Sequence, residues 1–84
     1  MSFYVYILQC CDGSYYTGYT KNLELRIQQH QNGKGAKYTK AHRPQRVAYM
    51  EPFGTRSAAM KREREIKKLS HQQKLTLIIG QDKK

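Results

Sequence analysis

Cysteine is scarce: the 84 residues contain only two, and these are neighbours, Cys10 and Cys11. Adjacent cysteines rarely pair with each other, so both are expected to be free thiols in a reducing compartment. No histidine stands near them in the sequence, which makes them poor candidates for a zinc site. The chain also shows no apolar run long enough to cross a bilayer, no signal peptide and no lipidation motif. We therefore expect a cytoplasmic protein.

Acidic residues are also few, since six Asp and Glu stand against 16 Lys and Arg and the net charge is +10. Such an excess repels itself in the folded protein and favours a polyanionic partner. Because nothing predicts membrane attachment, we expect nucleic acid rather than lipid. Six scattered acids also offer no carboxylate cluster of the kind that a two-metal site needs. A chain of 84 residues has room for one domain with a modest core.

The first 20 residues predict a β-hairpin. Residues 4–9 and 14–20 are rich in β-branched and aromatic side chains, which favour strands. Asp12-Gly13 between them is a strong turn signal. The seven tyrosines of the chain could serve packing alone, so the faces on which they lie decide what they can do.

The length of the hairpin loop decides whether Tyr6 and Tyr16 share a face. A two-residue loop pairs Tyr6 with Tyr19 and places the two phenols on opposite faces. A three-residue loop that ends in Gly13 at positive φ pairs Tyr16 with Leu8 and places both phenols on one face. The residues alone leave both registers open.

A short helix is predicted from Leu23 to Gln31, with Asn22 as its N-cap. Arg26 and His30 are four residues apart, so their side chains lie on one face of this helix. Taken alone, the pair would be interpreted as a solvated arginine and a surface histidine.

A basic loop follows this helix. It combines cationic side chains with a tyrosine, a composition that suits phosphate groups and a stacked base. A loop this long is more often a binding element than a simple connection. The candidates for substrate contact are Lys34, Lys37, Tyr38 and Arg43.

The second half of the sequence predicts a strand over 46–53 and a helix over 56–69. A last helix is predicted to begin at the capping-box pattern over 70–73. We expect this last helix to end near Gly80 and residues 81–84 to fray. Within the helix over 56–69, Glu63 lies in the same stripe as Ala59 and Ile66 and therefore faces the protein. A carboxylate there needs a partner, either a cation such as Arg26 or a metal ion.

Together these features resemble the GIY-YIG nuclease family, and specifically its small stand-alone members. The motifs are Tyr4-Val5-Tyr6, Tyr16-Thr17-Gly18, Arg26 with His30, and Glu63 after Ala59. Two positions depart from the family pattern: Tyr4 stands in place of the first glycine, and Thr17 in place of isoleucine. The family's late asparagine has no counterpart here. Each motif is weak alone, whereas all of them in order over nearly the whole chain form a strong signal.

The resemblance implies an α/β (α+β) fold with a three-stranded antiparallel sheet flanked by helices, in the order ββαβαα. It implies a single nuclease domain over 1–84. It also favours the three-residue hairpin loop, because the family's chemistry needs Tyr6 and Tyr16 on the same face.

The resemblance further implies hydrolysis of a phosphodiester with one divalent ion, Mg²⁺ or Mn²⁺, bound by Glu63. Arg26 would stabilise the charge that develops on the phosphate, and Tyr6 would deprotonate or orient the attacking water. Tyr16 would position Tyr6 or the phosphate, and His30 would share the proton relay. An unperturbed tyrosine is a poor base at neutral pH, so this interpretation requires Arg26 and the ion to lower the pKa of Tyr6.

The predicted function is therefore that of a metal-dependent nuclease, acting on DNA in repair, recombination or turnover. Endonucleolytic and exonucleolytic cleavage, RNA as substrate, the oligomeric state and a protein partner that supplies target choice all stay open. The first alternative is a basic nucleic-acid-binding module with this fold and little or no activity of its own. A second alternative is an interaction subunit whose charge docks it on a nucleoprotein.

Overall fold

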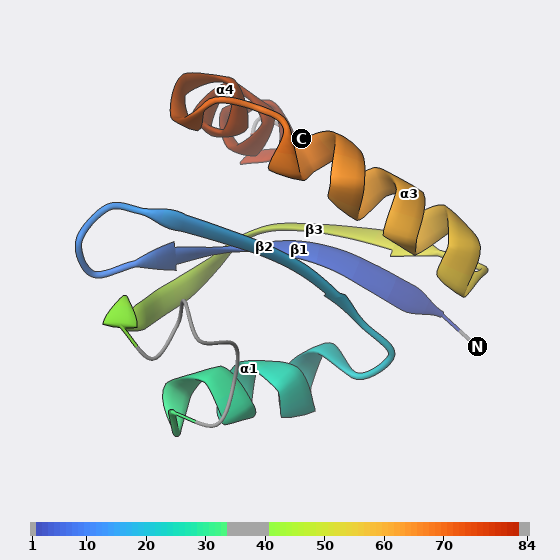
Figure 1. Cartoon of the computed structure of the whole chain (residues 1–84), viewed down its shortest axis with the longest axis horizontal. Helices are drawn as coiled ribbons and strands as arrows, with labels where there is room; N and C mark the ends of the chain where they lie inside the picture. The colour runs from blue at the N-terminus through green and yellow to red at the C-terminus, as the bar shows by residue number, and fades with distance from the viewer. Residues whose placement is uncertain (1, 34–40, 83–84) are drawn as a thin grey trace.

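The structure, a computed structural model, describes residues 2–33 and 41–82. In these residues three antiparallel strands and three helices follow the order ββαβαα, which confirms the predicted fold class (Figure 1). The elements are β1 (Phe3–Cys10), β2 (Tyr15–Thr20), α1 (Leu23–Gln31), β3 (Pro44–Phe53), α3 (Arg56–Lys67) and α4 (His71–Asp82). The strand order is β2-β1-β3, so β1 is central. None of the helices within the described ranges has the length and apolar character needed to cross a membrane.

The hairpin between β1 and β2 has the three-residue loop. The backbone N–H of Cys10 donates to the carbonyl oxygen of Ser14 at 2.8 Å, and Gly13 has a φ of 84°. Glycine adopts this left-handed conformation without strain, which explains its place at the end of the loop. Both cysteines are free, as predicted; Cys10 is buried and Cys11 is exposed.

This loop sets the register of the hairpin. Leu8 pairs with Tyr16, and Tyr6 pairs with Gly18. Because side chains alternate along a strand, Tyr6 and Tyr16 lie on the same face of the sheet. The register that the resemblance favours is confirmed.

The sheet separates the helices into two layers, with α1 on one face and α3 and α4 on the other (Figure 1). The odd-numbered residues of β1 face α3 and α4, where Val5 and Ile7 pack with Ala59, Ile66 and Ile78 in the main core. Full burial of each Val or Ile side chain contributes about 1.5–3 kcal/mol. The even-numbered residues of β1 face α1, so the central strand serves the core and the candidate site with alternate side chains.

Side-chain caps begin α1 and α4 where the sequence predicts them. The backbone N–H of Leu25 donates to Asn22 Oδ1 at 3.0 Å. The N–H of Ser70 donates to Gln73 Oε1 at 2.9 Å, and the N–H of Gln73 donates to Ser70 Oγ at 3.2 Å. These reciprocal bonds form a capping box and fix where α4 starts.

Three predicted boundaries are wrong. β3 begins at Pro44 rather than Arg46, which the fixed φ of proline permits at the first residue of a strand. α3 ends at Lys67 rather than Leu69. The third error, at the end of α4, has a tertiary cause.

α4 continues through Gly80 to Asp82, beyond the predicted end near Gly80. The side-chain amide of Gln81 pairs with the backbone of Met50: the Met50 N–H donates to Oε1 at 3.2 Å, and Nε2 donates to the Met50 carbonyl at 2.6 Å. These two bonds tie the last turn of the helix to β3 and outweigh the low helix propensity of Gly80.

Thr17 is a polar residue at a core position, and its replacement is expected to stabilise the protein. It is 3% exposed, and its Oγ1 has no hydrogen-bond partner in the described part of the chain. Thr17→Val keeps the shape and removes the unsatisfied hydroxyl, so we expect a gain of about 1 kcal/mol. In thermal unfolding followed by circular dichroism, Tm should rise by roughly 4–8 °C. Thr76→Val on the exposed side of α4 is the control, and a fall in Tm for Thr17→Val would contradict this account.

Candidate functional site

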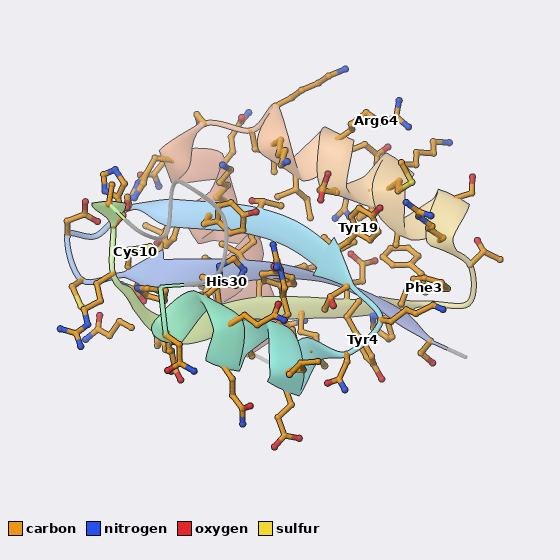
Figure 2. All side chains as sticks on the ribbon, turned by 60° about the horizontal axis from the view of Figure 1, so that its bottom comes forward. Phe3, Tyr4, Cys10, Tyr19, His30 and Arg64 are labelled. Atoms are coloured by element: carbon orange, nitrogen blue, oxygen red, sulfur yellow. The ribbon has the colours of Figure 1, made fainter. Side chains whose placement is uncertain are left out.

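Two phenols and an imidazole meet on the α1 face of the sheet. Tyr6 comes from β1, Tyr16 from β2 and His30 from the last turn of α1, where it lies against the strands (Figure 2). Tyr6 Oη and His30 Nε2 are 2.9 Å apart and share a hydrogen bond. The ring centroids of Tyr6 and Tyr16 are 6.4 Å apart, and those of Tyr16 and His30 are 5.1 Å apart. The structure thus brings three of the five predicted catalytic residues into contact.

Burial differs within this cluster. Tyr6 is 0% exposed and His30 is 1% exposed, whereas Tyr16 is half-buried. Tyr16 therefore forms the side of the cluster that faces outward, and Tyr6 lies behind it.

Arg26 lies one helical turn before His30 and is half-buried beside the same phenol. Its Nη1 donates to Gln29 Oε1 at 3.1 Å, a contact that limits the conformations of the guanidinium. Arg26 lies close enough to Tyr6 for its guanidinium to favour the phenolate. The arginine predicted to stabilise the phosphate therefore lies at the phenolic cluster.

The pKa of Tyr6 moves opposite to the expected direction. Burial raises it to about 12, and the charges of Tyr16 and Glu63 add to the rise, while Arg26 offsets only part of it. The expected lowering is therefore wrong for Arg26 alone, because the free energy of desolvating a phenolate is larger than the attraction of one guanidinium. Burial and the charge of Arg26 lower the pKa of His30. At neutral pH the phenol is protonated and the imidazole neutral. In the tautomer with its proton on Nδ1, His30 accepts the hydrogen bond from Tyr6 at Nε2.

Gly18 makes room for this phenol. A Cβ built on Gly18 would lie 2.6 Å from Tyr6 Oη and 2.9 Å from Tyr6 Cζ, closer than any side chain tolerates. The backbone of β2 therefore forms a flat floor under the Tyr6 ring. A glycine inside a strand often marks such a close approach, so the sequence carried a signal for this role. Gln29 lies three residues after Arg26 on the same helix, so helical spacing was the sequence signal for this partner.

Glu63 lies on α3, across the sheet from α1, on the flank of the helix that faces β2. Two turns earlier on the same flank, Arg56 Nε donates to the hydroxyl of Tyr19 on β2 at 3.2 Å. The side chain of Glu63 is 16% exposed, and its Oε1 lies 3.4 Å from Lys67 Nζ. The predicted cation partner thus exists, and it is Lys67 rather than Arg26. The charge of Glu63 acts on the Tyr6 phenol, although among the described residues no hydrogen bond joins Glu63 to Tyr6, Tyr16 or His30.

The residues present fit a weakly held, hard divalent ion. No group of three or more His, Cys, Asp or Glu side chains that could hold a metal occurs in residues 2–33 and 41–82, which excludes a fully protein-ligated site there. A single carboxylate that already attracts an ammonium group suits Mg²⁺, because this ion keeps most of its water ligands. Glu63 is the residue that would hold it.

The predicted substrate contacts divide into two groups. Lys34, Lys37 and Tyr38 lie outside the described residues. Arg43 is exposed and lines a hollow of about 480 Å³ together with His30 and Pro44. His30 and Arg43 therefore line the same hollow, and Arg43 is one of the residues predicted to bind substrate.

A second hollow, of about 560 Å³, lies at the N-terminal part of α1. Its walls include Tyr4, Leu23, Ile27 and Met50 and are mainly apolar. Arg26 and His30 do not line it, and His30 lies in the last turn of α1, about two turns from Leu23. The phenolic cluster is the better candidate site, since the shifted pKa values of Tyr6 and His30 are found there.

Comparison with known proteins relates the chain to one family. The family model of the GIY-YIG catalytic domain matches residues 2–76. UPF0213 protein SSP2268 of Staphylococcus saprophyticus is 59% identical over 75 residues, which cover 89% of this chain and 92% of that protein. A UPF0213 protein of Staphylococcus aureus is 52% identical over 77 residues, which cover 92% and 94% of the two chains.

Two solution NMR structures have the same fold. UPF0213 protein BH0048 of Bacillus halodurans is 47% identical, with a TM-score of 0.59 over 93% of this chain and 83% of that one. Protein EF2693 of E. faecalis is 42% identical, with a TM-score of 0.67 over 100% of this chain and 90% of that one.

The GIY-YIG catalytic domain defines a nuclease superfamily whose members act on nucleic acid and generally use divalent metal ions. Its model matches most of the residues, and relatives more than half identical cover about nine tenths of the chain. Three of the motifs that carried the resemblance build the cluster of Tyr6, Tyr16, Arg26 and His30, and the fourth supplies Glu63 on α3. The chain belongs to the GIY-YIG catalytic domain family.

Proposed function

We propose that this protein is a phosphodiesterase that cleaves nucleic acid and requires one divalent metal ion. The proposal depends above all on the 2.9 Å hydrogen bond between Tyr6 and His30, with Arg26 acting on the same phenol. Hydrolysis of a phosphodiester needs a proton acceptor for the attacking water and a cation beside the phosphate, and this cluster supplies both. Because the protein carries a net charge of +10, we propose a polyanionic substrate. We favour DNA in the cytoplasm, cleaved in repair or turnover.

The buried pair acts as a proton relay in this proposal. Because Tyr6 is fully buried, the relay requires the half-buried Tyr16 side of the cluster to admit one water when substrate binds. This attacking water gives a proton to Tyr6 Oη while the phenolic proton passes to His30 Nε2, so that an imidazolium forms and Tyr6 stays neutral. The water oxygen bonds to phosphorus, the bond to the leaving oxygen breaks, and that oxygen takes a proton from solvent. A concerted relay removes the need for a free phenolate, which a pKa of about 12 makes rare.

The outer groups of the cluster bind the substrate. Arg26 donates to the non-bridging phosphate oxygens, where its forked donors match the developing charge. The half-buried Tyr16 orients the phosphate against Tyr6. A divalent ion held by Glu63, preferably Mg²⁺, would neutralise charge on the phosphate and the leaving oxygen.

The ion pair between Glu63 and Lys67 supports a second candidate function, in which Glu63 binds no metal. Because Lys67 neutralises this carboxylate at 3.4 Å, the fold does not need a metal to hold Glu63 in place. The alternative is a basic module that binds nucleic acid without cleaving it.

Cleavage assays separate these two functions. The protein is incubated with labelled single-stranded, double-stranded and branched DNA and with RNA, in Mg²⁺, Mn²⁺ or EDTA. We expect cleavage only with metal, and a fall of at least about 10²-fold in Glu63→Gln. Glu65→Gln, which removes a more exposed acid on the same helix, is the matched control and should cleave normally. Tight, salt-dependent binding without cleavage, unchanged or stronger in Glu63→Gln, would favour the binding module.

The proton relay predicts the pH dependence of cleavage. His30 must be neutral to accept the proton, and its lowered pKa places the acid limb of kcat below the ordinary histidine value of about 6.5. Tyr6 keeps its proton to about pH 12, so it produces no basic limb between roughly pH 7 and 10. Single-turnover rates from pH 5 to 10 test this. An acid limb that persists in His30→Gln would show that another group causes it.

A further inference from the structure

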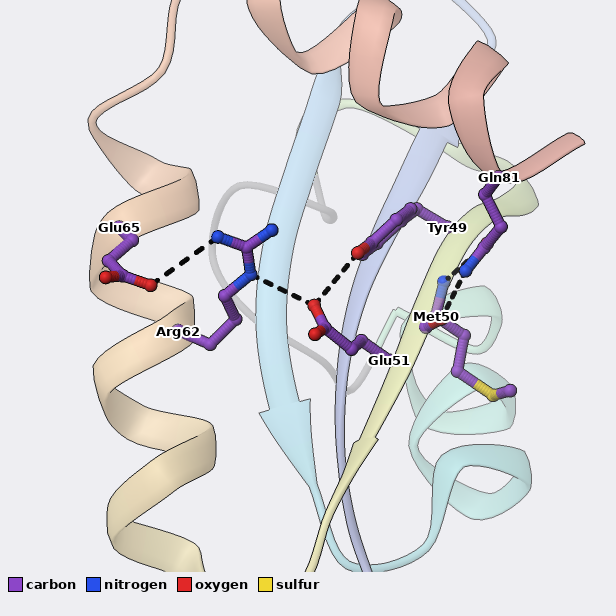
Figure 3. A network of polar contacts seen from close by, with 6 residues as sticks. All are labelled: Tyr49, Met50, Glu51, Arg62, Glu65 and Gln81. Carbon is purple, nitrogen blue, oxygen red and sulfur yellow. Dashed lines mark hydrogen bonds and ion pairs between the residues drawn. The ribbon is translucent and has the colours of Figure 1, made fainter.

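A polar network joins β3 to α3 on the face of the sheet opposite the phenolic cluster (Figure 3). The hydroxyl of Tyr49 donates to Glu51 Oε1 at 2.9 Å, and Arg62 Nε donates to the same oxygen at 3.0 Å. Arg62 also donates through Nη1 to Glu65 Oε1 at 3.5 Å. The carboxylate of Glu51 thus binds one donor from its own strand and one from the helix.

The inner part of this network is the stronger part. Tyr49 is 7% exposed, and burial together with the hydrogen bond to Glu51 raises its pKa, so the phenol keeps its proton and donates. The side chains of Arg62 and Glu51 are 30% and 33% exposed, while that of Glu65 is 53% exposed. Partial burial strengthens a charged hydrogen bond, so the Glu51–Arg62 pair should hold the helix and the Arg62–Glu65 pair should contribute little.

Arg62 and Glu63 are neighbours on opposite flanks of α3. Successive residues are about 100° apart around a helix. Ala59 and Ile66 are fully buried beneath the helix, and Arg62 points to β3 on one side of them. Glu63 points to β2 on the other side. A contact that holds Arg62 therefore fixes the rotation of α3 about its axis, and with it the direction of Glu63.

The fully buried contacts of α3 are a methyl group, Ala59, and one branched aliphatic side chain, Ile66, and Arg56 ties its first turn to Tyr19 on β2. The Arg62–Glu51 pair is a tie to β3 on the other flank, next to Glu63, so its loss leaves the rotation of this part of the helix less firmly determined. A roll of about 10° would move a carboxylate roughly 6 Å from the helix axis by about 1 Å. Functional groups must be held within about 0.5 Å of their productive position, so such a roll would misplace Glu63.

We propose that Arg62 and Glu51 are positioning residues that hold Glu63 at its metal-binding position by fixing the rotation of α3. This role rests on the proposed function, because it assigns Glu63 as the residue that binds the ion. Tyr49 supports it by holding the Glu51 carboxylate in line with Arg62.

The test uses Mn²⁺ binding to the full chain, measured by electron paramagnetic resonance, together with kcat and KM for DNA cleavage in Mn²⁺. We expect Arg62→Ala and Glu51→Gln to weaken Mn²⁺ binding by about 10-fold or more. kcat at subsaturating Mn²⁺ should fall by a similar factor, while KM for DNA stays unchanged. Arg62→Lys keeps the charge and should restore part of the affinity. Glu65→Gln removes only the outer partner and should match the original protein.

Combination with Glu63→Gln shows whether Arg62 acts through Glu63. In that background only weak residual Mn²⁺ binding is expected, and Arg62→Ala should not change it further. If Arg62→Ala does not fold by circular dichroism, Arg62→Met, which keeps most of the stem, and Glu51→Gln carry the same test.

The outcomes distinguish this inference from the function on which it rests. Loss of Mn²⁺ binding in Glu63→Gln with full binding in Arg62→Ala, Arg62→Met and Glu51→Gln would overturn the positioning role and leave the proposed function intact. Unchanged Mn²⁺ binding and cleavage in Glu63→Gln would overturn the proposed function itself. A KM increase without a change in Mn²⁺ affinity would place Arg62 at the nucleic acid instead, against the inference.

Discussion

Arg26→Ala is expected to lower kcat by about 10²–10³-fold and to weaken DNA binding by less than about tenfold. Arg26 is half-buried beside Tyr6, and its fork is oriented by Gln29 at 3.1 Å. A cation placed at the reacting phosphate gains most when charge builds up on the phosphate oxygens, so its loss is felt in the transition state more than in the bound ground state. Single-turnover rates and filter-binding affinities measure the two effects separately.

Arg46→Ala is the matched control for this change in charge. Arg46 is exposed on β3, and its Nε donates to Gln9 Oε1 at 2.8 Å. Its removal subtracts the same unit of charge without touching the phenolic cluster, so kcat should stay within about twofold. Equal losses of rate and affinity in Arg26→Ala would contradict its role in the transition state and would make it an ordinary phosphate contact.

Arg26 and Tyr6 also show what the sequence can and cannot predict about the site. Helical spacing placed Arg26 and His30 on one face, and the alternation of strand residues placed Tyr6 and Tyr16 on another, both from local geometry. The sequence could not show that these two faces enclose the Tyr6 hydroxyl completely. Burial is a property of the packed layers, and it raises the pKa of this phenol where a nearby cation alone would lower it.

Glu63 illustrates the same limit on the other helix. Its position in the stripe of Ala59 and Ile66 correctly predicted that it faces the protein and needs a partner. The partner Lys67 lies at the i,i+4 position and was available from spacing alone. The contact between Arg62 and Glu51 was not, because it joins residues 11 apart on different elements.

The ends of the helices also divide into those set by neighbouring residues, which the sequence predicts, and those set by tertiary contacts, which it does not. Caps made by neighbouring residues, such as Asn22 for α1 and Ser70 with Gln73 for α4, are local and were predicted correctly. The extension of α4 past Gly80 depends on Gln81 meeting Met50, a contact between residues 31 apart. Local propensity favoured an end at the glycine, and a tertiary pair of hydrogen bonds reversed it.

Gly18→Ala is expected to lower the rate of cleavage by about 10²-fold or more and to destabilise the protein by about 1–3 kcal/mol. The new Cβ would lie 2.6 Å from Tyr6 Oη and 2.9 Å from Cζ, so the phenol or the β2 backbone must move. Either movement breaks the 2.9 Å hydrogen bond between Tyr6 and His30. Cleavage rates and urea unfolding measure the two consequences.

Gly54→Ala is the matched control, because a Cβ at Gly54 has no atom within 4 Å and Gly54 lies outside the site. It should leave both rate and stability nearly unchanged. The double variant Gly18→Ala with Tyr6→Phe separates crowding from chemistry: loss of the hydroxyl removes the closest contact, so part of the stability should return while cleavage stays absent. If Gly18→Ala cleaves normally, the Tyr6 ring can leave its place over β2 without cost, and the relay through its hydroxyl to His30 cannot be how this protein moves the proton.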